Sequence, residues 1–301
     1  MKLPSVTIKN LLEAGVHLGH KTFRWNPKMD KYIFGSKNSI HIIDLVQTLE
    51  MTQRALQEIH KCIASGGKIL FVSTKKQAAG TIENLAKDTS QFYVNHRWLG
   101  GMLTNWKTIS NSIKRYKKLS QDLKKENTGF TKKELLKMGI QRDKLERSLG
   151  GIADMVKIPD MIFIIDTNVE ELAVKEALKL NIPIVAVVDT NSNPSGINYP
   201  IPGNDDARRA INLYCDLVKH TVLDAQKNIS KQDNVKEEAK TENNKKITSV
   251  KTEIKKHDKK KETKKVEKEE IKKKGDKIVK KISKSIISKV TALASKAKKT
   301  K

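Results

Sequence analysis

The chain has 301 residues, 31% of them charged, and a formal net charge of +26. A field of this sign attracts polyanions and makes binding depend on salt, so nucleic acid is the leading partner and an anionic membrane surface the second. No run of about 18 apolar residues occurs and the two cysteines are isolated, which argues against a membrane-spanning helix, a disulfide framework and a thiolate zinc site. The first residues resemble neither a secretion signal nor a transit peptide, so we expect a cytoplasmic bacterial protein.

The first distinctive segment is a loop that combines cations with an indole. Lys21, Arg24 and Lys28 surround Trp25, and a proline interrupts the segment. A loop of this kind can hold its cations against a phosphate backbone. The alternative is a surface loop pinned by a buried Trp25.

Three apolar segments predict the strands of a parallel sheet. Residues 68–73, 161–165 and 184–188 are short, β-branched and apolar without alternation, which favours strands covered on both faces. Helical segments are expected over 45–64, 75–88, 170–180 and 205–226. Alternation of strands and helices predicts a layered α/β body over residues 1–230. A small hairpin with its turn at residues 35–38 precedes this pattern.

Residues 95–107 place two indoles, cations and a Gly-Gly pair close together. Aromatic faces stack on bases and cations neutralise phosphates, so Arg97, Trp98, Trp106 and Lys107 suit irregular RNA. The indoles could instead anchor a turn to the core, and the sequence leaves both interpretations open.

Residues 105–149 interrupt the alternation. Two polar helices, expected over 104–126 and 131–148 with a turn at 127–129, each carry a narrow apolar stripe, which predicts an antiparallel, coiled-coil-like hairpin. Its outer faces carry Lys114, Arg115, Lys117, Lys118, Lys124, Lys125, Lys132 and Lys133. Such a surface is either a solvated helix face or a docking face for RNA or protein.

Histidines and aspartates mark the candidate chemical sites. His17 and His20 could share a divalent ion with Asp189 or Asp205, or serve as hydrogen-bonded structural residues and helix caps. No phosphate loop, dinucleotide fingerprint or nucleophile motif occurs, so we predict no catalytic residue and no enzyme. The rival function is a nucleotide-binding enzyme with its ligand near Asp166 and Asp189, at the strand ends.

Residues 231–301 differ in composition from the body. They hold 26 lysines against 11 acidic residues and no aromatic residue, so we expect a mostly disordered, basic tail that is either a mobile RNA-binding arm or a dispensable extension. Apolar residues at helical spacing over 277–299 indicate an amphipathic helix, which could order on RNA, a partner or a membrane surface, or fluctuate without a partner.

Several long blocks of this sequence resemble those of the bacterial small-subunit ribosomal protein S-two family. They are 11–20, 24–29, 97–107, 148–152, 159–183, 188–193 and 201–206. Together they span about residues 3–225, whereas the lysine-rich tail departs from the family pattern.

The resemblance implies a flavodoxin-like domain with an inserted coiled-coil hairpin. It implies a cytoplasmic, ribosome-bound structural protein near the junction of head and body of the small subunit. Such proteins bind small-subunit ribosomal RNA and help to dock ribosomal protein S-one in translation. No cofactor is required, although some relatives hold zinc. The RNA-contact residues that we infer are Lys21, Arg24, Trp25, Lys28, Arg97, Trp98, Trp106, Lys107, Lys114 and Arg115.

Overall fold

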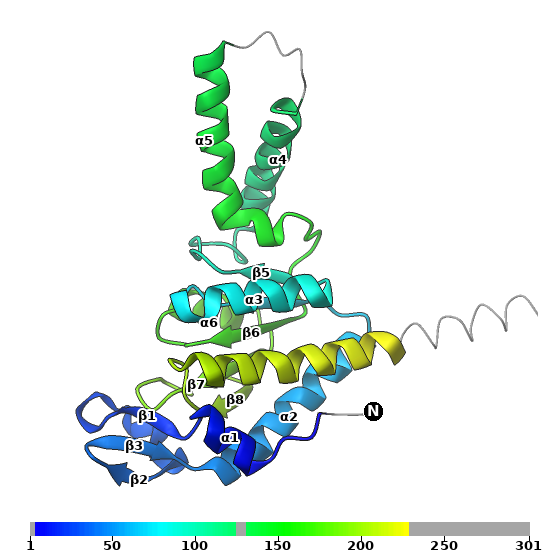
Figure 1. The fold of residues 1–301 in the computed structure, drawn as a ribbon. Coiled ribbons are helices and arrows are strands. Elements are labelled where there is room, and N and C mark those ends of the chain that lie inside the picture. Colours follow the sequence, from blue (N-terminus) through cyan, green and yellow to red (C-terminus); the bar gives the residue numbers. More distant parts are fainter. Residues whose placement is uncertain (1–3, 125–130, 229–301) are drawn as a thin grey trace, which may run out of the picture. The chain divides into compact units, whose positions relative to one another are not determined.

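Five parallel strands form the central sheet of the computed structural model, which describes residues 4–124 and 131–228 (Figure 1). In pairing order they are β5 (Phe92–Val94), β4 (Ile69–Val72), β6 (Met161–Ile165), β7 (Ile184–Val188) and β8 (Tyr199–Pro202). Renumbered along the chain within this sheet, the order is 2-1-3-4-5, the doubly wound arrangement of flavodoxin-like folds. The predicted α/β class is confirmed, whereas the predicted tail and its 277–299 helix lie outside the described residues.

Side chains of each central strand enter two different cores. On β6, Phe163 and Ile165 belong to one core while Ile162 and Ile164 belong to the other. All five residues of β6 and of β7 are buried, which explains why their sequences are apolar without alternation.

Helices cover both faces of this sheet. The first core is covered by α1 (Ile8–Ala14), α2 (Leu45–Ala64), α3 (Lys76–Thr89) and an unlabelled helix over residues 208–228, drawn in yellow-green in Figure 1. On the other face, α6 (Glu171–Lys179) buries its small side chains against the sheet. The predicted helices are therefore confirmed to within about three residues at each end. None of the described helices is long and apolar enough to cross a bilayer.

A second, antiparallel sheet lies near the N-terminus. Its order is β1 (Leu18–Lys21), β3 (Ile40–Ile43), β2 (Ile33–Lys37). The predicted hairpin is present, but its turn is at Asn38 and Ser39 rather than at residues 35–38. Both turn residues have positive φ, 53° and 59°, which matches the right-handed twist of the strands in a two-residue turn.

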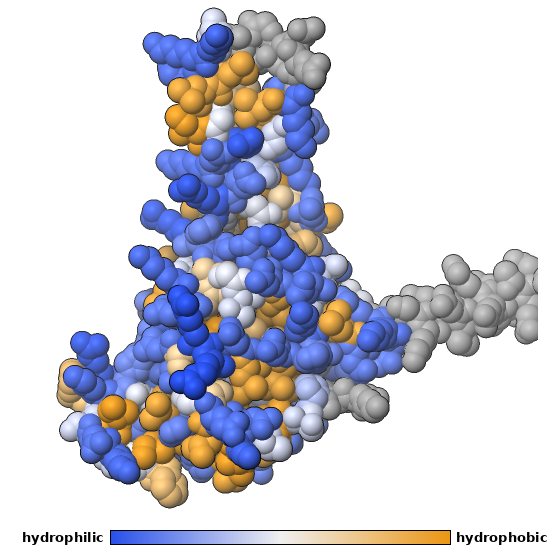
Figure 2. Space-filling view, in the orientation of Figure 1, coloured by the Kyte–Doolittle hydropathy of each residue, from blue (hydrophilic) through white to orange (hydrophobic). Residues whose placement is uncertain are grey.

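The insertion consists of two antiparallel helices, α4 (Trp106–Asp122) and α5 (Lys132–Leu149), which lie side by side in Figure 1. Each helix is least exposed along the predicted apolar stripe, and Ile109, Ile113 and Leu149 join the second core at its base. Of the predicted outer cations, those within the described residues are exposed, and Figure 2 shows hydrophilic residues over much of the visible face of both helices. Lys125 and the predicted turn at 127–129 lie outside the described residues.

The base of the hairpin depends on Gly151. A β-carbon at this position would overlap the backbone carbonyl oxygen of Tyr93 in β5, and the tyrosine ring blocks it further. We expect Gly151→Ala to lower the free energy of unfolding by about 2 kcal/mol or more, because backbone must move to admit the methyl group. Urea unfolding followed by circular dichroism measures this change.

Gly139, in the middle of α5, provides a control for Gly151, which lies in the 3-10 turn just after that helix. A β-carbon there meets nothing within 4 Å. Gly139→Ala should therefore raise the free energy of unfolding by about 0.5–1 kcal/mol, since alanine is the better helix former. Equal effects of the two substitutions would refute the close approach at Gly151.

Candidate nucleic-acid interface

The loop between β5 and α4 carries one group of the predicted RNA-contact residues. Arg97 and Lys107 are exposed, and within the described residues neither makes a hydrogen bond or an ion pair. Trp98 points inward instead: only 7% of it is exposed, and its Nε1–H donates to Glu176 Oε1 across 3.0 Å. This position favours the interpretation in which Trp98 fixes the loop over the one in which it stacks on a base.

Glu176 of α6 holds this loop in place. Beyond Trp98, its two carboxylate oxygens accept hydrogen bonds from the backbone N–H groups of Gly101 (2.8 Å), Leu103 (2.9 Å) and Thr104 (3.1 Å), and from the Thr104 hydroxyl (3.1 Å). Burial raises the pKa of this carboxyl group, but the donors together outweigh burial and lower it below its ordinary value. The ionised carboxylate therefore stabilises the loop conformation, including the left-handed φ of 79° at Gly101.

The other two tryptophans occupy different positions. Trp106 begins α4 and packs, partly buried, against the second core. Trp25 is 38% exposed, and its ring lies 5.5 Å from that of His41 at a tilt of 40°. Of the three indoles, Trp25 has the most surface free for stacking.

A second group of predicted residues lies on the segment that follows β1. Lys21, Arg24 and Lys28 are exposed beside the 3-10 turns η1 (Thr22–Arg24) and η2 (Pro27–Tyr32). Lys28 Nζ donates to Ser195 Oγ across 3.1 Å, and the Asn26 N–H donates to the Thr190 carbonyl across 2.8 Å. These bonds hold the segment beside β7, whereas the loop after β5 lies at the opposite edge of the sheet, so the structure keeps the two groups apart.

Lys114 and Arg115 both lie on the exposed surface of α4. Arg115 Nη2 donates to Gln141 Oε1 of α5 across 3.3 Å. Lys117, one turn nearby, reaches Asp154 at 2.9 Å. Arg115 therefore joins the two helices and Lys117 joins α4 to the segment after α5, while the Lys114 side chain makes no such contact within the described residues.

Lys75 occupies the crevice at the carboxyl ends of β4 and β6, where flavodoxin-like folds bind their ligands. Its ammonium lies 2.9 Å from Asp166, 2.8 Å from Asp205 and 2.6 Å from Asp206. The pKa of Lys75 is raised, because the attraction of these carboxylates outweighs its burial. Burial and the neighbouring Asp189 and Asp166 raise the pKa of Asp205 to about 7.

His20 joins the same acidic cluster. Its Nδ1 lies 2.9 Å from Asp189 and its Nε2 lies 3.5 Å from Asp206, and the Asp189 carboxylate raises the pKa of His20. No contact within the described residues brings His17 to this cluster. In residues 4–124 and 131–228, no three His, Cys, Asp or Glu side chains converge as metal ligands, and the Lys75 ammonium supplies the positive charge among the carboxylates.

Sequence reasoning missed Glu176 and Lys75. Glu176 is one acidic residue in an ordinary amphipathic helix, and its partners lie more than 70 positions away. Lys75 follows a strand without a glycine-rich motif. The one available signal was the placement of Asp166 and Asp189 after strands, which pointed to the correct crevice but not to the lysine within it.

Comparison with known proteins now identifies the family. Residues 11–225 match the family model described as ribosomal protein S2. The chain belongs to the ribosomal protein S2 family. Its relatives include small ribosomal subunit protein uS2 of Parvibaculum lavamentivorans, 57% identical over 74% of this chain and 88% of the relative.

Other relatives of that name agree closely. The uS2 protein of Sinorhizobium medicae is 59% identical over 74% of this chain and 88% of its own length. The uS2 protein of Phenylobacterium zucineum is 59% identical over 74% of this chain and 76% of its own length. The ribosomal protein S2 family is structural rather than catalytic and works without a cofactor, and its match leaves residues 231–301 outside.

Substitution of Glu176 tests the loop anchor. We expect Glu176→Gln to lower the free energy of unfolding by about 2 kcal/mol. The glutamine amide carries no charge, and its NH₂ group replaces an accepting oxygen with a donor that faces the loop N–H groups. Hydrogen exchange of the Gly101, Leu103 and Thr104 amides should accelerate. The stabilisation by Glu176 should be complete above the ordinary glutamate pKa of 4.5 and decline as pH falls through the lowered folded-state pKa.

The matched control is Glu171→Gln on the same helix. Glu171 is exposed and pairs only with Lys175, so its loss should change stability by less than about 1 kcal/mol and leave the loop amides protected. Identical exchange rates in the two variants would show that Glu176 does not hold the loop.

Proposed function

We propose that this chain is a structural constituent of the small ribosomal subunit that binds small-subunit ribosomal RNA and supports translation in the bacterial cytoplasm. The observation that carries the proposal is the β5–α4 loop. Arg97 in this loop and Lys107 at the start of α4 are exposed and form no ion pair within the described residues, while Glu176 holds the loop in place. A fixed loop with free cations loses little entropy when it meets phosphates. Membership of the ribosomal protein S2 family supports the same function.

The predicted RNA-contact residues then form two surfaces rather than one. Arg97, Lys107, Lys114 and Arg115 belong to the loop and hairpin, and the second surface is the segment that follows β1. A folded RNA with several helices can meet both surfaces at once, which suits the resemblance-based placement near the junction of head and body. Trp25 would stack on a nucleotide or rest against phosphate-contacting loops, whereas Trp98 and Trp106 act by holding loop and helix in position.

The buried ion pairs in the crevice at the strand ends argue against the rival function, a nucleotide-binding enzyme. Lys75 and the carboxylates of Asp166 and Asp205 are largely buried there, and the lysine forms an ion pair with each carboxylate. The β4–α3 connection, residues 73–75, contains no glycine and is too short to cradle phosphates. A ligand at this edge would have to break buried ion pairs, which costs several kcal/mol.

Replacement of the free cations tests RNA binding. We expect Arg97→Ala and Lys107→Ala each to weaken binding of small-subunit ribosomal RNA by about fivefold and to reduce the slope of log affinity against log salt by about 1, as for one lost phosphate contact. Filter binding at several salt concentrations measures both quantities. Lys179→Ala, an exposed lysine on α6, is the control and should change neither. Wild-type affinity and slope in the loop variants would argue against the proposed interface.

We also propose that the small sheet and the turn after it dock a protein partner, for which the family resemblance suggests ribosomal protein S-one. Large apolar side chains are exposed there: Phe34 of β2 (79%), Phe23 of η1 (72%) and Leu18 of β1 (44%). Figure 2 shows hydrophobic residues on the visible surface of this region. Exposed aromatic groups next to cations are typical of protein-binding surfaces.

Polar substitution of these aromatic groups tests partner docking. The variant Phe23→Ser/Phe34→Ser should bind ribosomal protein S-one at least about tenfold more weakly, because two anchors that would be buried on docking are lost. Calorimetric titration measures the affinity, and Phe34→Ser alone, outside the RNA-contact segment that contains Phe23, should leave RNA binding unchanged. Val156→Ser, 91% exposed elsewhere, is the control. Equal affinities of all three proteins for S-one would refute this surface.

A further inference from the structure

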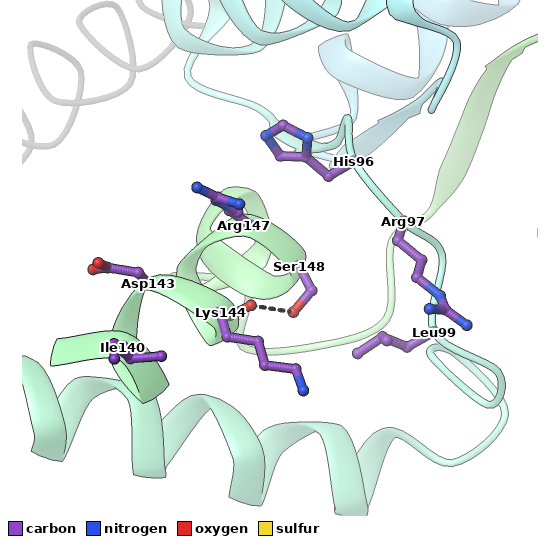
Figure 3. Close-up of a pocket in the computed structure, with 8 residues that line it drawn as sticks. All are labelled: His96, Arg97, Leu99, Ile140, Asp143, Lys144, Arg147 and Ser148. Carbon is purple, nitrogen blue, oxygen red and sulfur yellow. Dashed lines mark hydrogen bonds between the residues drawn. The ribbon is translucent and has the colours of Figure 1, made fainter. Parts of the chain in front are cut away.

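A pocket of about 590 Å³ lies between the loop that follows β5 and the C-terminal half of α5. Figure 3 shows its two walls: His96, Arg97 and Leu99 come from the loop, and the other side chains come from the helix. The helix residues are Ile140, Asp143, Lys144, Arg147 and Ser148. His96, Arg97 and Leu99 belong to the segment 95–107 that the sequence pattern singled out, and Arg97 alone was among the predicted contacts.

The pocket is electropositive. The side chains of Arg97, Lys144 and Arg147 are exposed, and within the described residues none of these three side chains makes a hydrogen bond or an ion pair. Asp143 is the one carboxylate in the lining, and the Arg142 guanidinium pairs with it, the Nε–Oδ1 distance being 2.9 Å. Three free cations therefore line the pocket from both walls, with side chains that extend in different directions (Figure 3), and their charge suits a phosphate.

The same pocket offers apolar surface. Ile140 is 61% exposed on α5, and Leu99, partly buried, packs against the second core while facing the pocket. The Ser148 hydroxyl donates back to the Lys144 and Leu145 carbonyls of its own helix, so it competes little for an outside partner. A ligand that combines a flat apolar face with an anion fits these walls, whereas a bare anion leaves Ile140 and Leu99 uncovered.

We propose that this pocket receives one unpaired nucleotide of the small-subunit ribosomal RNA. The phosphate lies against Arg147 and Lys144, and the base lies between Leu99 and Ile140. The inference deepens the proposed function and rests on it, because the pocket shares Arg97 with the RNA-contact loop. The volume is that of ordinary small-ligand sites, and the open side lets the RNA strand enter and leave.

The cationic wall is tested with Arg147→Gln and Lys144→Gln in the full chain, using small-subunit ribosomal RNA as the probe. Each variant should bind about tenfold more weakly, and the salt slope should fall by about 1 when one phosphate contact is lost. Lys179→Gln on α6 keeps the wild-type values. Unchanged RNA affinity in both pocket variants overturns the inference. The proposed function still stands in that case, provided that the wild-type chain binds the RNA. Failure of the wild-type chain to bind RNA at any salt concentration overturns both.

The apolar wall is tested separately with Ile140→Ala. Because Ile140 is exposed, this change leaves the fold intact; it should weaken RNA binding about threefold with no change in salt slope, since no charge is lost. Photocrosslinking of RNA that contains 4-thiouridine, followed by mass spectrometry, should place a crosslink on the 96–99 segment or on α5 near Ile140. The placement of a base in this pocket is overturned if Ile140→Ala binds RNA with wild-type affinity and all crosslinks lie outside the 96–99 segment and α5.

Discussion

The hydrogen bonds to Glu176 are the interaction on which the conformation of the β5–α4 loop depends. One carboxylate on α6 accepts from the Trp98 indole and from three backbone N–H groups of a loop that is more than 70 residues away in sequence. The loop has no regular ladder of its own, so these bonds satisfy groups that would otherwise need water. The Glu176 anchor leaves Arg97, a predicted contact residue, exposed to solvent and keeps Trp98, which supports the loop, buried.

The second constraint is the buried ion cluster around Lys75. A flavodoxin-like sheet presents a crevice at its strand ends, and many folds of this class use it for a cofactor or a substrate. Here a lysine and three aspartates fill the crevice with paired charges. These ion pairs occupy the place where related folds bind ligands, and the predicted contact residues lie instead on loops, on the small sheet and on the hairpin.

Sequence reasoning predicted those elements whose signal is local. The strands β4, β6 and β7 were predicted because buried parallel strands are continuously apolar. The strands β5 and β8 were missed, because β5 has three residues and β8 contains Pro200 and Pro202, which are tolerated at a sheet edge but do not indicate a strand. The sequence predicted the candidate contact cations, and the structure places them on the surface. The loop anchor, Glu176, was not predicted, because long-range hydrogen bonds leave no periodic trace in a sequence.

Both ends of the α4–α5 insertion are secured to the same strand. The chain leaves β5 through the pinned loop and returns at Gly151, which lies directly against Tyr93. Because entry and exit lie close together, the sheet depends on the base of the hairpin, where Ile109, Ile113 and Leu149 join the second core, and little on the part beyond it. The outer part of the α4–α5 hairpin can therefore change in length or be replaced in evolution, to suit a differently shaped ribosome, without altering the folding of the core.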